Sequence, residues 1–304
     1  MCGLAGILYR EPGRAGPTGR LLTDLLGVLG SRGTDGTGVA LYGTPQDGAR
    51  VLRVYLGEAA SPAVEAGVIA RIREVDGTAV AAAGRQGDVL RLVLHGDAPV
   101  EALARAAERG APGVSVFSAG EALEVVKDAG DAARLDALYA VSEASGSHGI
   151  GHTRLATESR VDVRHSHPFW ARPFPDLAIV HNGQITNYHR LRRRYEAQGW
   201  HFGTDNDSEI IALFLGHEMA SGATLEEAMR ASMSALDGTF TYLVATADGI
   251  GFARDAFATK PLIVAETDGC VAFASEERAL CRAFGDGPLE TRQPAEKEVR
   301  VWRR

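Results

Sequence analysis

CGLAGILY (residues 2–9) is the stretch that decides the fold, because it is a small and apolar run with a cysteine at its first position. Such a run predicts a buried β-strand that begins at residue 2. Leucines then recur at helical spacing between residues 21 and 29, and SRGTDGTG (31–38) follows as a glycine-rich loop. A second strand, GVALYG (38–43), comes directly after the loop.

The segment from about 50 to 118 has a pattern of its own. We expect strands at VLRVYL, TAVAAA, VLRLVLH and GVSVFS, and helices at PAVEAGVIARI and VEALARAAER. Their order is βαββαβ, the split arrangement of a ferredoxin-like unit. This order predicts an inserted lobe. Two helical stretches, near 120–128 and 131–144, are expected to lead the chain back to the main domain. The insert is therefore expected to occupy about 50–145.

The second half of the chain alternates polar motifs with short strands. Helices are expected at about 187–197, 207–219 and 224–236, and the last part of the chain is rich in strands. Helices at both ends of the strand runs predict two packed sheets that are covered by helices. The expected fold class is therefore α+β, a four-layer αββα sandwich with an inserted ferredoxin-like βαββαβ lobe.

Cys2 is the first candidate for chemistry. A small second residue normally leads to removal of the initiator Met1, which would leave Cys2 with a free α-amine. The α-amine has a reference pKa of about 7.7–8.0 and the thiol one of about 8.5. One residue can therefore supply both the nucleophile and the general base. Any chain can begin with Met-Cys by chance, and a buried strand cysteine is the alternative.

Five motifs in a fixed order favour the chemical interpretation of Cys2. They are MCGLAGI (1–7), SRGTDGTG, GHTRLAT (151–157), HNG (181–183) and TDNDSE (204–209). This series resembles the class II glutamine amidotransferases, an N-terminal-nucleophile family that includes the amidotransferase parts of glutamate synthase, glucosamine-phosphate synthase and the purine amidophosphoribosyltransferase. The resemblance covers residues 2–44 and 149–280. It implies an N-terminal-nucleophile hydrolase domain over residues 2–304, interrupted by the insert, that hydrolyses glutamine through a Cys2 thioester.

The resemblance also implies roles for the matched positions. Arg154 can clamp the α-carboxylate of glutamine, since a guanidinium fork matches its geometry. Asp207 can bind the substrate ammonium, with Asp205 as the competing candidate and helix capping as the alternative role. Asn182 and Gly183 resemble an oxyanion hole, for which an Asn-Gly turn between strands is the alternative.

Three further positions complete the expected site. Arg32 resembles a family arginine that helps to arrange the N-terminus, and Thr157 and His181 lie within matched motifs; all three are expected to contribute to substrate binding. The sequence also differs from the family pattern at two positions. Thr34 replaces a proline, which affects the rigidity of its loop, and Leu155 replaces an aromatic residue of several relatives, which affects the glutamine lid.

Composition argues against several other classes of protein. The net charge of −7 and the pI of about 5.7 disfavour nucleic acid or an anionic membrane as the main partner. No apolar run is long enough to predict a membrane span, and the arginine run HRLRRRY (189–195) is expected to be the solvated face of a helix. Three scattered cysteines fit a cytoplasmic location. His165 and His167 are expected to be structural, and neither a metal nor an organic cofactor is expected.

The acceptor of the ammonia is expected to lie on another chain. No synthase or transferase pattern follows the amidotransferase motifs, and with its insert the sequence looks most like the free-standing GlxB-type subunit of glutamate-synthase-like systems, related to N-methylglutamate synthase. The resemblance thus implies a separate synthase subunit as partner, and it leaves homo- and hetero-oligomers open. The alternatives are a stand-alone glutaminase, an amidotransferase for another acceptor, and a non-catalytic regulatory subunit that keeps the fold.

Overall fold

Two antiparallel sheets form the centre of the molecule, for which a computed structural model describes residues 2–11, 13–45, 48–156, 160–285 and 289–304. Over these ranges the larger sheet has seven strands in the order β15-β13-β14-β1-β8-β2-β7. In chain order they are β1 (Gly3–Tyr9), β2 (Gly36–Tyr42), β7 (Leu123–Asp128), β8 (His148–Arg154), β13 (Ile263–Glu266), β14 (Cys270–Ala274) and β15 (Thr291–Arg292). The expected first strand is therefore a central strand, paired with β14 on one side and β8 on the other.

The second central sheet has the order β16-β12-β11-β10-β9. Its strands are β9 (Phe169–Trp170), β10 (Ala178–Ile185), β11 (Gly238–Thr246), β12 (Gly249–Arg254) and β16 (Val299–Arg303). One continuous apolar core holds Leu4 and Ile150 of the larger sheet together with Val180 and Leu243 of this one. The two sheets therefore pack face to face.

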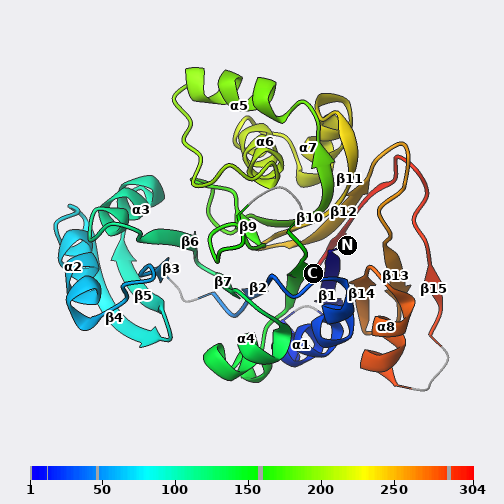
Figure 1. Ribbon diagram of the computed structural model, residues 1–304, viewed down its shortest axis with the longest axis horizontal. Helices are drawn as coiled ribbons and strands as arrows, with labels where there is room; N and C mark the ends of the chain where they lie inside the picture. The colour runs from blue at the N-terminus through cyan, green and yellow to red at the C-terminus, as the bar shows by residue number, and fades with distance from the viewer. Residues whose placement is uncertain (1, 12, 46–47, 157–159, 286–288) are drawn as a thin grey trace.

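Helices cover the outer face of each sheet (Figure 1). Those on the larger sheet are α1 (Thr18–Leu29), α4 (Ala132–Tyr139) and α8 (Glu277–Phe284), and those on the other sheet are α5 (Tyr188–Ala197), α6 (Ser208–Ala220) and α7 (Leu225–Ala235). One outer core joins Ile7 of β1 to Leu26 of α1, and another joins Ile179 of β10 to Ile211 of α6. The four-layer αββα prediction is confirmed.

The alternation of β1 explains its apolar sequence. Leu4 and Leu8 point into the core between the sheets, whereas Ala5 and Ile7 point towards α1, because successive side chains of a strand face opposite sides. Both faces are buried, so both must be apolar, and CGLAGILY has no room for an alternating polar residue.

The inserted lobe lies beside the sandwich, at the left of Figure 1. Its elements are β3 (Ala49–Tyr55), α2 (Pro62–Arg73), β4 (Thr78–Gln86), β5 (Val89–Gly96), α3 (Val100–Glu108) and β6 (Ser115–Gly120). The sheet order is β4-β5-β3-β6, so β5 separates β3 from β4 and β3 separates β5 from β6. This is the split βαβ arrangement expected of a ferredoxin-like unit.

The expected helix near 120–128 is wrong, because this segment is strand β7. Leu123–Asp128 pairs with Gly36–Tyr42 at the edge of the larger sheet, with Tyr42 opposite Leu123 and Thr37 opposite Asp128. The residues of this segment suit either a helix or a strand. Pairing with β2, about eighty residues earlier in the chain, makes it a strand. The chain has therefore returned to the sandwich by residue 123.

Asp176 fixes this return to the sandwich. Its carboxylate accepts hydrogen bonds from the backbone N–H groups of Glu121, Ala122 and Leu123 at 3.0, 2.9 and 2.8 Å. Its own carbonyl accepts a hydrogen bond from the hydroxyl of Tyr42 at 3.2 Å. The turn between the lobe and β7 is thus tied to the loop that precedes β10.

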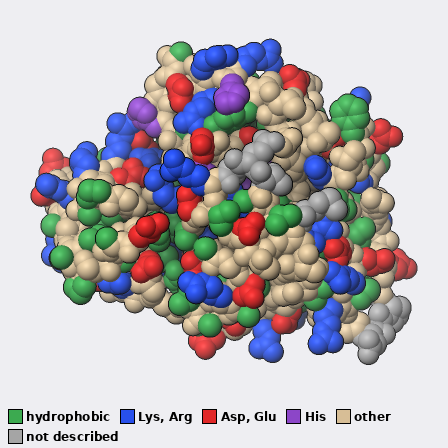
Figure 2. All heavy atoms as spheres, viewed as in Figure 1, with side chains coloured by type: hydrophobic (Ala, Val, Ile, Leu, Met, Phe, Trp, Pro, Cys, Tyr) green, Lys and Arg blue, Asp and Glu red, His purple; other side chains and the backbone are tan. Residues whose placement is uncertain are grey.

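The surface is mixed in charge (Figure 2). Positive and negative side chains are interspersed over the face shown, and a row of basic side chains lies at its top, over α5. Arg190, Arg193 and Arg194 are exposed there, and Arg192 pairs with Glu196. Among the described residues, no helix has the length and apolar character needed to cross a membrane.

Close packing of α1 on β8 generates a first prediction. A Cβ added to Gly151 would lie 2.8 Å from Leu26 Cδ1 and 3.3 Å from Val39 Cγ1. We expect Gly151→Ala to lower the free energy of unfolding by about 1–3 kcal/mol, because the neighbouring side chains must shift. Gly84→Ala is the matched control, since a Cβ at Gly84 meets no heavy atom within 4 Å. Urea unfolding measures both, and equal midpoints for the two variants would contradict the packing argument.

Candidate active site

A pocket of about 590 Å³ brings most of the expected site residues together. Five of the eight line it: Cys2, Arg154, His181, Gly183 and Asp207. Asn182 and Arg32 lie directly behind Cys2, and Thr157 falls outside the described residues. The volume lies within the range of about 300–1,000 Å³ that is typical of small-molecule sites.

The backbone of Cys2 is held from two directions. Arg32 Nε donates to the carbonyl oxygen of Cys2 at 2.8 Å, and Asn182 Nδ2 donates to the same oxygen at 3.1 Å. Arg32 is oriented in turn by Glu276, whose carboxylate lies 2.8 Å from Nη1. Two donors on one carbonyl fix the peptide plane of Cys2, and with it the direction of the side chain.

The thiol of Cys2 lies at the pocket wall beside Leu155. The backbone N–H of Leu155 donates to Cys2 Sγ over 3.3 Å, and Sγ lies 3.5 Å from the carbonyl oxygen of the same residue. Leu155, one of the two positions that depart from the family pattern, lines the pocket and is 41% exposed.

Strand parity explains why His152 and Asn182 meet. Residues two apart on a strand face the same side. His152 therefore faces the same side of β8 as Ile150, and Asn182 the same side of β10 as Val180. Both sides face the space between the sheets. His152 Nε2 and Asn182 Oδ1 are 3.0 Å apart. The amide oxygen can only accept, so Nε2 donates, and this bond turns the NH₂ group of Asn182 towards Cys2.

Gly183 occupies a backbone conformation that other residues rarely adopt. Its φ is 136°, and an added Cβ would lie 1.9 Å from the carbonyl oxygen of Thr239 on β11. Gly183 and Thr239 lie within the paired stretches of β10 and β11 rather than in a tight turn. The alternative of an Asn-Gly turn is therefore wrong, and close backbone approach explains the glycine.

Asp207 precedes α6 but its side chain does not cap the helix. Asp207 Oδ2 accepts instead from the backbone N–H of Ile185 at 2.8 Å, which ties the start of α6 to the end of β10. Asp205, the competing candidate, also lines the pocket, but its carboxylate lies 2.6 Å from His165 Nε2, and Asp162 lies 2.7 Å from Nδ1 of the same ring. His165 thus joins two loops, as expected of a structural histidine.

Arg154 is buried at the end of β8, with 4% of its surface exposed. Nη1 donates to the carbonyl oxygen of Arg160 at 2.8 Å. Burial lowers the pKa of Arg154, and the nearby Cys2, Asp162 and Asp35 act in the opposite direction. A buried guanidinium at the wall of a pocket interacts strongly with a bound anion where the surrounding dielectric is low.

Three histidines form the floor of the pocket. The rings of His152 and His167 stack with centroids 4.2 Å apart, and the backbone N–H of His181 donates to His167 Nδ1 at 3.1 Å. The hydroxyl of Ser208 lies 2.9 Å from His181 Nδ1 and 3.2 Å from His167 Nε2. Burial lowers the pKa of all three rings, that of His152 to about 3. The rings are therefore neutral at physiological pH.

Some of these contacts were not foreseen from the sequence. Sequence analysis treated His167 only as a structural loop residue, whereas it lines the pocket. Ser275 was missed: its hydroxyl accepts from the backbone N–H of Leu4 at 2.8 Å and lies 3.4 Å from Asn182 Nδ2. Neither position has a local signal, because both contacts join segments far apart in the chain. Over the described ranges, no group of three or more His, Cys, Asp or Glu is arranged to hold a metal ion.

Known protein families and curated proteins include relatives of this chain. Residues 152–282 match the family model described as a glutamine amidotransferase domain. The chain is 38% identical to the glutamine amidotransferase-like protein GlxB of Rhizobium meliloti, over 92% of this chain and 91% of that protein. It is 35% identical to the glutamine–fructose-6-phosphate aminotransferase of Shewanella oneidensis over 48% of this chain, which is 24% of that enzyme.

Solved structures share the fold. One described as the allosteric regulatory enzyme of purine biosynthesis superposes with a TM-score of 0.62 at 19% identity. The glutamine phosphoribosylpyrophosphate amidotransferase of B. subtilis gives 0.61 at 18% identity. Each comparison covers 99% of this chain, which spans about half the length, 49%, of the solved chains.

The buried histidines generate a prediction on pH. Burial holds the pKa of folded His152 at about 3, whereas an unfolded imidazole ionises near 6.5. Below about pH 6.5 the unfolded chain therefore binds protons that the folded chain does not, and we expect the free energy of unfolding to fall as the pH drops towards 3. Urea unfolding at a series of pH values measures this.

The variant His152→Gln tests whether His152 causes the loss of stability at low pH. Glutamine keeps an N–H donor for Asn182 but cannot take up a proton. Its unfolding free energy should fall less steeply between about pH 6.5 and pH 4 than that of the wild type. Parallel curves for the two proteins would contradict the assignment to His152.

Proposed function

Since the chain belongs to the class II glutamine amidotransferases, we propose that it hydrolyses the side-chain amide of glutamine with Cys2 as the nucleophile. Removal of Met1 exposes the Cys2 α-amine in this proposal, and residues 2–304 act as one domain that the lobe interrupts. The observation that carries the proposal is the shared pocket of Cys2, Arg154 and Asp207. A thiol, a buried guanidinium and a carboxylate face one cavity of the right size for an amino acid.

The two charged side chains match the two ends of an amino acid. In the proposed complex, the guanidinium of Arg154 binds the α-carboxylate through paired hydrogen bonds. One oxygen of Asp207 is held by the backbone N–H of Ile185, and the other binds the α-ammonium. His181 lies 3.8 Å from that second oxygen and shares Ser208 with His167, so it positions the carboxylate. The contribution of Thr157 stays a prediction.

The reaction divides into two acyl-transfer steps. The α-amine of Cys2 takes the thiol proton, and Sγ attacks the amide carbon of the substrate. The amine then returns the proton to the leaving nitrogen, the C–N bond breaks, and ammonia departs. Water attacks the γ-glutamyl thioester with the same amine as general base, which releases glutamate and restores the thiol.

The oxyanion formed by this attack needs hydrogen-bond donors. Asn182 has two N–H groups on Nδ2, one directed to the Cys2 carbonyl at 3.1 Å and one near Ser275 Oγ at 3.4 Å. The second contact is long and weak, so the oxyanion can replace Ser275 as the acceptor. The backbone N–H of Gly183 supplies the second donor in this proposal. Removal of one such donor typically costs about 3–4 kcal/mol of transition-state stabilisation.

Covalent labelling tests the nucleophile and the substrate together. We expect intact mass spectrometry to show loss of Met1, and a diazo-ketone analogue of glutamine to add once, on Cys2. Excess glutamine should block the adduct. Arg154→Ala should abolish it, because the analogue loses its carboxylate clamp, whereas Arg190→Ala on the surface of α5 should label normally.

The exposed Cys281 is an internal control for labelling. An adduct there as well as on Cys2 would show general thiol reactivity and not recognition of glutamine. A processed Cys2 that stays unlabelled, in a protein that still binds glutamine, would refute its role as the nucleophile.

We further propose that the ammonia passes to a separate synthase subunit of the glutamate-synthase kind. The likeness to the GlxB protein extends over nine-tenths of both chains, so it includes the lobe as well as the amidotransferase motifs. A cytoplasmic location fits this proposal, since the three cysteines are unpaired in the described structure.

A mild pull-down with this chain as bait tests the partner. We expect a synthase-like protein to be recovered, and its addition to divert ¹⁵N from the glutamine amide into a product instead of free ammonia. Full glutamine turnover by the isolated chain, with all ¹⁵N released as ammonia and no synthase recovered, would instead establish a stand-alone glutaminase.

A further inference from the structure

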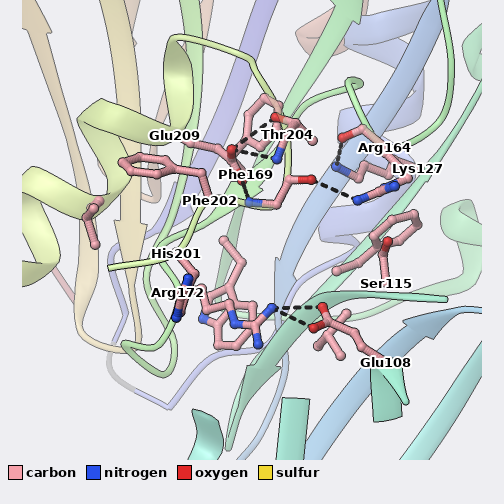
Figure 3. A pocket seen from close by; sticks show the side chains of 15 residues that line it. Glu108, Ser115, Lys127, Arg164, Phe169, Arg172, His201, Phe202, Thr204 and Glu209 are labelled. Carbon is pink, nitrogen blue, oxygen red and sulfur yellow. Dashed lines mark hydrogen bonds and ion pairs between the residues drawn. The ribbon is translucent and has the colours of Figure 1, made fainter. Parts of the chain in front are cut away.

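A second cavity, of about 70 Å³, lies where the lobe meets the sandwich (Figure 3). Its walls come from β6 and β7, from residues 164–172, and from residues 201–213 at the start of α6. It opens into an outer hollow of about 370 Å³, with which it shares Glu108, Arg164, Arg172, His201, Phe202 and Gly203. None of its lining residues belongs to the glutamine pocket.

Lys127 of β7 is a buried cation at the wall of this cavity, with 3% of its surface exposed. Its ammonium donates to the carbonyl oxygens of Arg164, Ser166 and Pro168 at 3.1, 2.7 and 3.3 Å. Among the described residues, no carboxylate forms an ion pair with it. A buried charge without a counter-ion is costly, so the site favours an anion.

Aromatic rings flank Lys127 on two sides. Nζ lies 4.7 Å from the centroid of Phe117 and 4.8 Å from that of Phe169, within the range of cation–π contacts. Burial lowers the pKa of Lys127 to about 7, which Glu209 and Asp162 oppose and Arg164 and Arg154 reinforce. The rings and the three carbonyls stabilise the charged form, but no carboxylate of the described residues forms an ion pair with it.

Ser115 of β6 supplies an independent observation. Its side chain lines the cavity and the residue is 8% exposed, yet Oγ has no hydrogen-bond partner among the described residues. Ser115 and Phe117 share one face of the strand, because they are two residues apart. Buried polar atoms are rarely unpartnered in native proteins, so this hydroxyl indicates a missing partner in the cavity.

Arg172 and the carboxylates that line the cavity already have partners. Arg172 binds Glu101 and Glu108, and the Glu209 carboxylate accepts from the backbone N–H groups of Gly203 and Thr204 at 3.1 and 2.9 Å. Figure 3 shows the bonds of Arg172 to Glu108 and of Glu209 to its backbone partners. Inside the cavity a ligand would therefore meet the Lys127 cation, which donates to backbone carbonyls but has no carboxylate partner among the described residues, and the unpartnered Ser115 hydroxyl, beside apolar walls. The cavity has room for about five waters, or a ligand of a few heavy atoms.

We propose that this cavity is a binding site for a small monocarboxylate, with its carboxylate facing Lys127 and Ser115 and its carbon chain against Phe117 and Phe169. The carboxylate supplies the counter-ion of Lys127 and accepts a hydrogen bond from the Ser115 hydroxyl. The open hollow outside, with the exposed Arg164 and His201 at its edge, provides the route of entry.

The same lysine connects this site to the glutamine pocket. The carbonyls that Lys127 holds belong to the loop 164–168, which carries His167. His167 stacks on His152, whose Nε2 holds Asn182. A bound carboxylate that draws Lys127 away from these carbonyls alters the support of Asn182. This regulatory part of the inference rests on the proposed function, whereas the binding site does not.

Lysine NMR tests the site directly in the full-length protein. The sequence has three lysines, Lys127, Lys260 and Lys297, so ε-¹³C lysine labelling gives three signals, and Lys127→Met identifies the first. We expect acetate to shift the Lys127 signal in a saturable way. Its apparent pKa should rise by about 1–3 pH units, as an opposite charge within about 4–6 Å requires. Acetamide, which has the shape without the charge, should have no such effect.

Ser115→Ala should weaken acetate binding several-fold. Thr78→Val is the matched control, because Thr78 Oγ1 is also a buried, unpartnered hydroxyl of the lobe but does not line the cavity. A Lys127 signal that acetate leaves unmoved, or that moves equally with acetamide or in Ser115→Ala, overturns the proposal. If acetate binds and glutamine turnover is unchanged, the site stands and its link to the glutamine pocket is refuted.

Discussion

The carbonyl oxygen of Cys2 is the point on which the whole site depends. It accepts one hydrogen bond from Arg32, in the turn after α1, and one from Asn182, on the opposite sheet. These bonds fix the start of the chain between two layers whose shared core is mostly apolar. Apolar contacts are not directional, so hydrogen bonds of this kind are what give the thiol a defined orientation, and orientation is a large part of catalysis.

Much of the fold could be predicted from the sequence because local patterns and tertiary structure agree. Each of the helices expected in the second half lies within one residue of its observed bounds at both ends. The order βαββαβ was enough to indicate the lobe, because few sheet arrangements satisfy it. The motif series predicted one site for Cys2, Arg154 and Asp207 through its resemblance to a known family, and all three line one pocket.

The rest could not be predicted, because it depends on contacts between distant segments. Leu123–Asp128 became a strand through pairing with β2. The carboxylate of Asp207 is committed to an N–H of β10 and not to its own helix, which no spacing rule reveals. Lys127 was given no role from the sequence, yet it is buried beneath the loop that carries His167. Burial of polar residues by distant segments is the feature that sequence reading misses most easily.

The lobe is inserted between two strands that pair with each other. β2 ends at Tyr42 and β7 begins opposite it at Leu123, and Gly43 N–H donates to the carbonyl of Ala122 at 3.1 Å. The chain therefore leaves and re-enters the sandwich at neighbouring positions, where a short hairpin would serve equally well. Such a site allows a whole module to be acquired or lost in one genetic event, with the register of the sheet preserved. Only the side chains that bind the module, Arg172 and Asp176 among them, would then need to change.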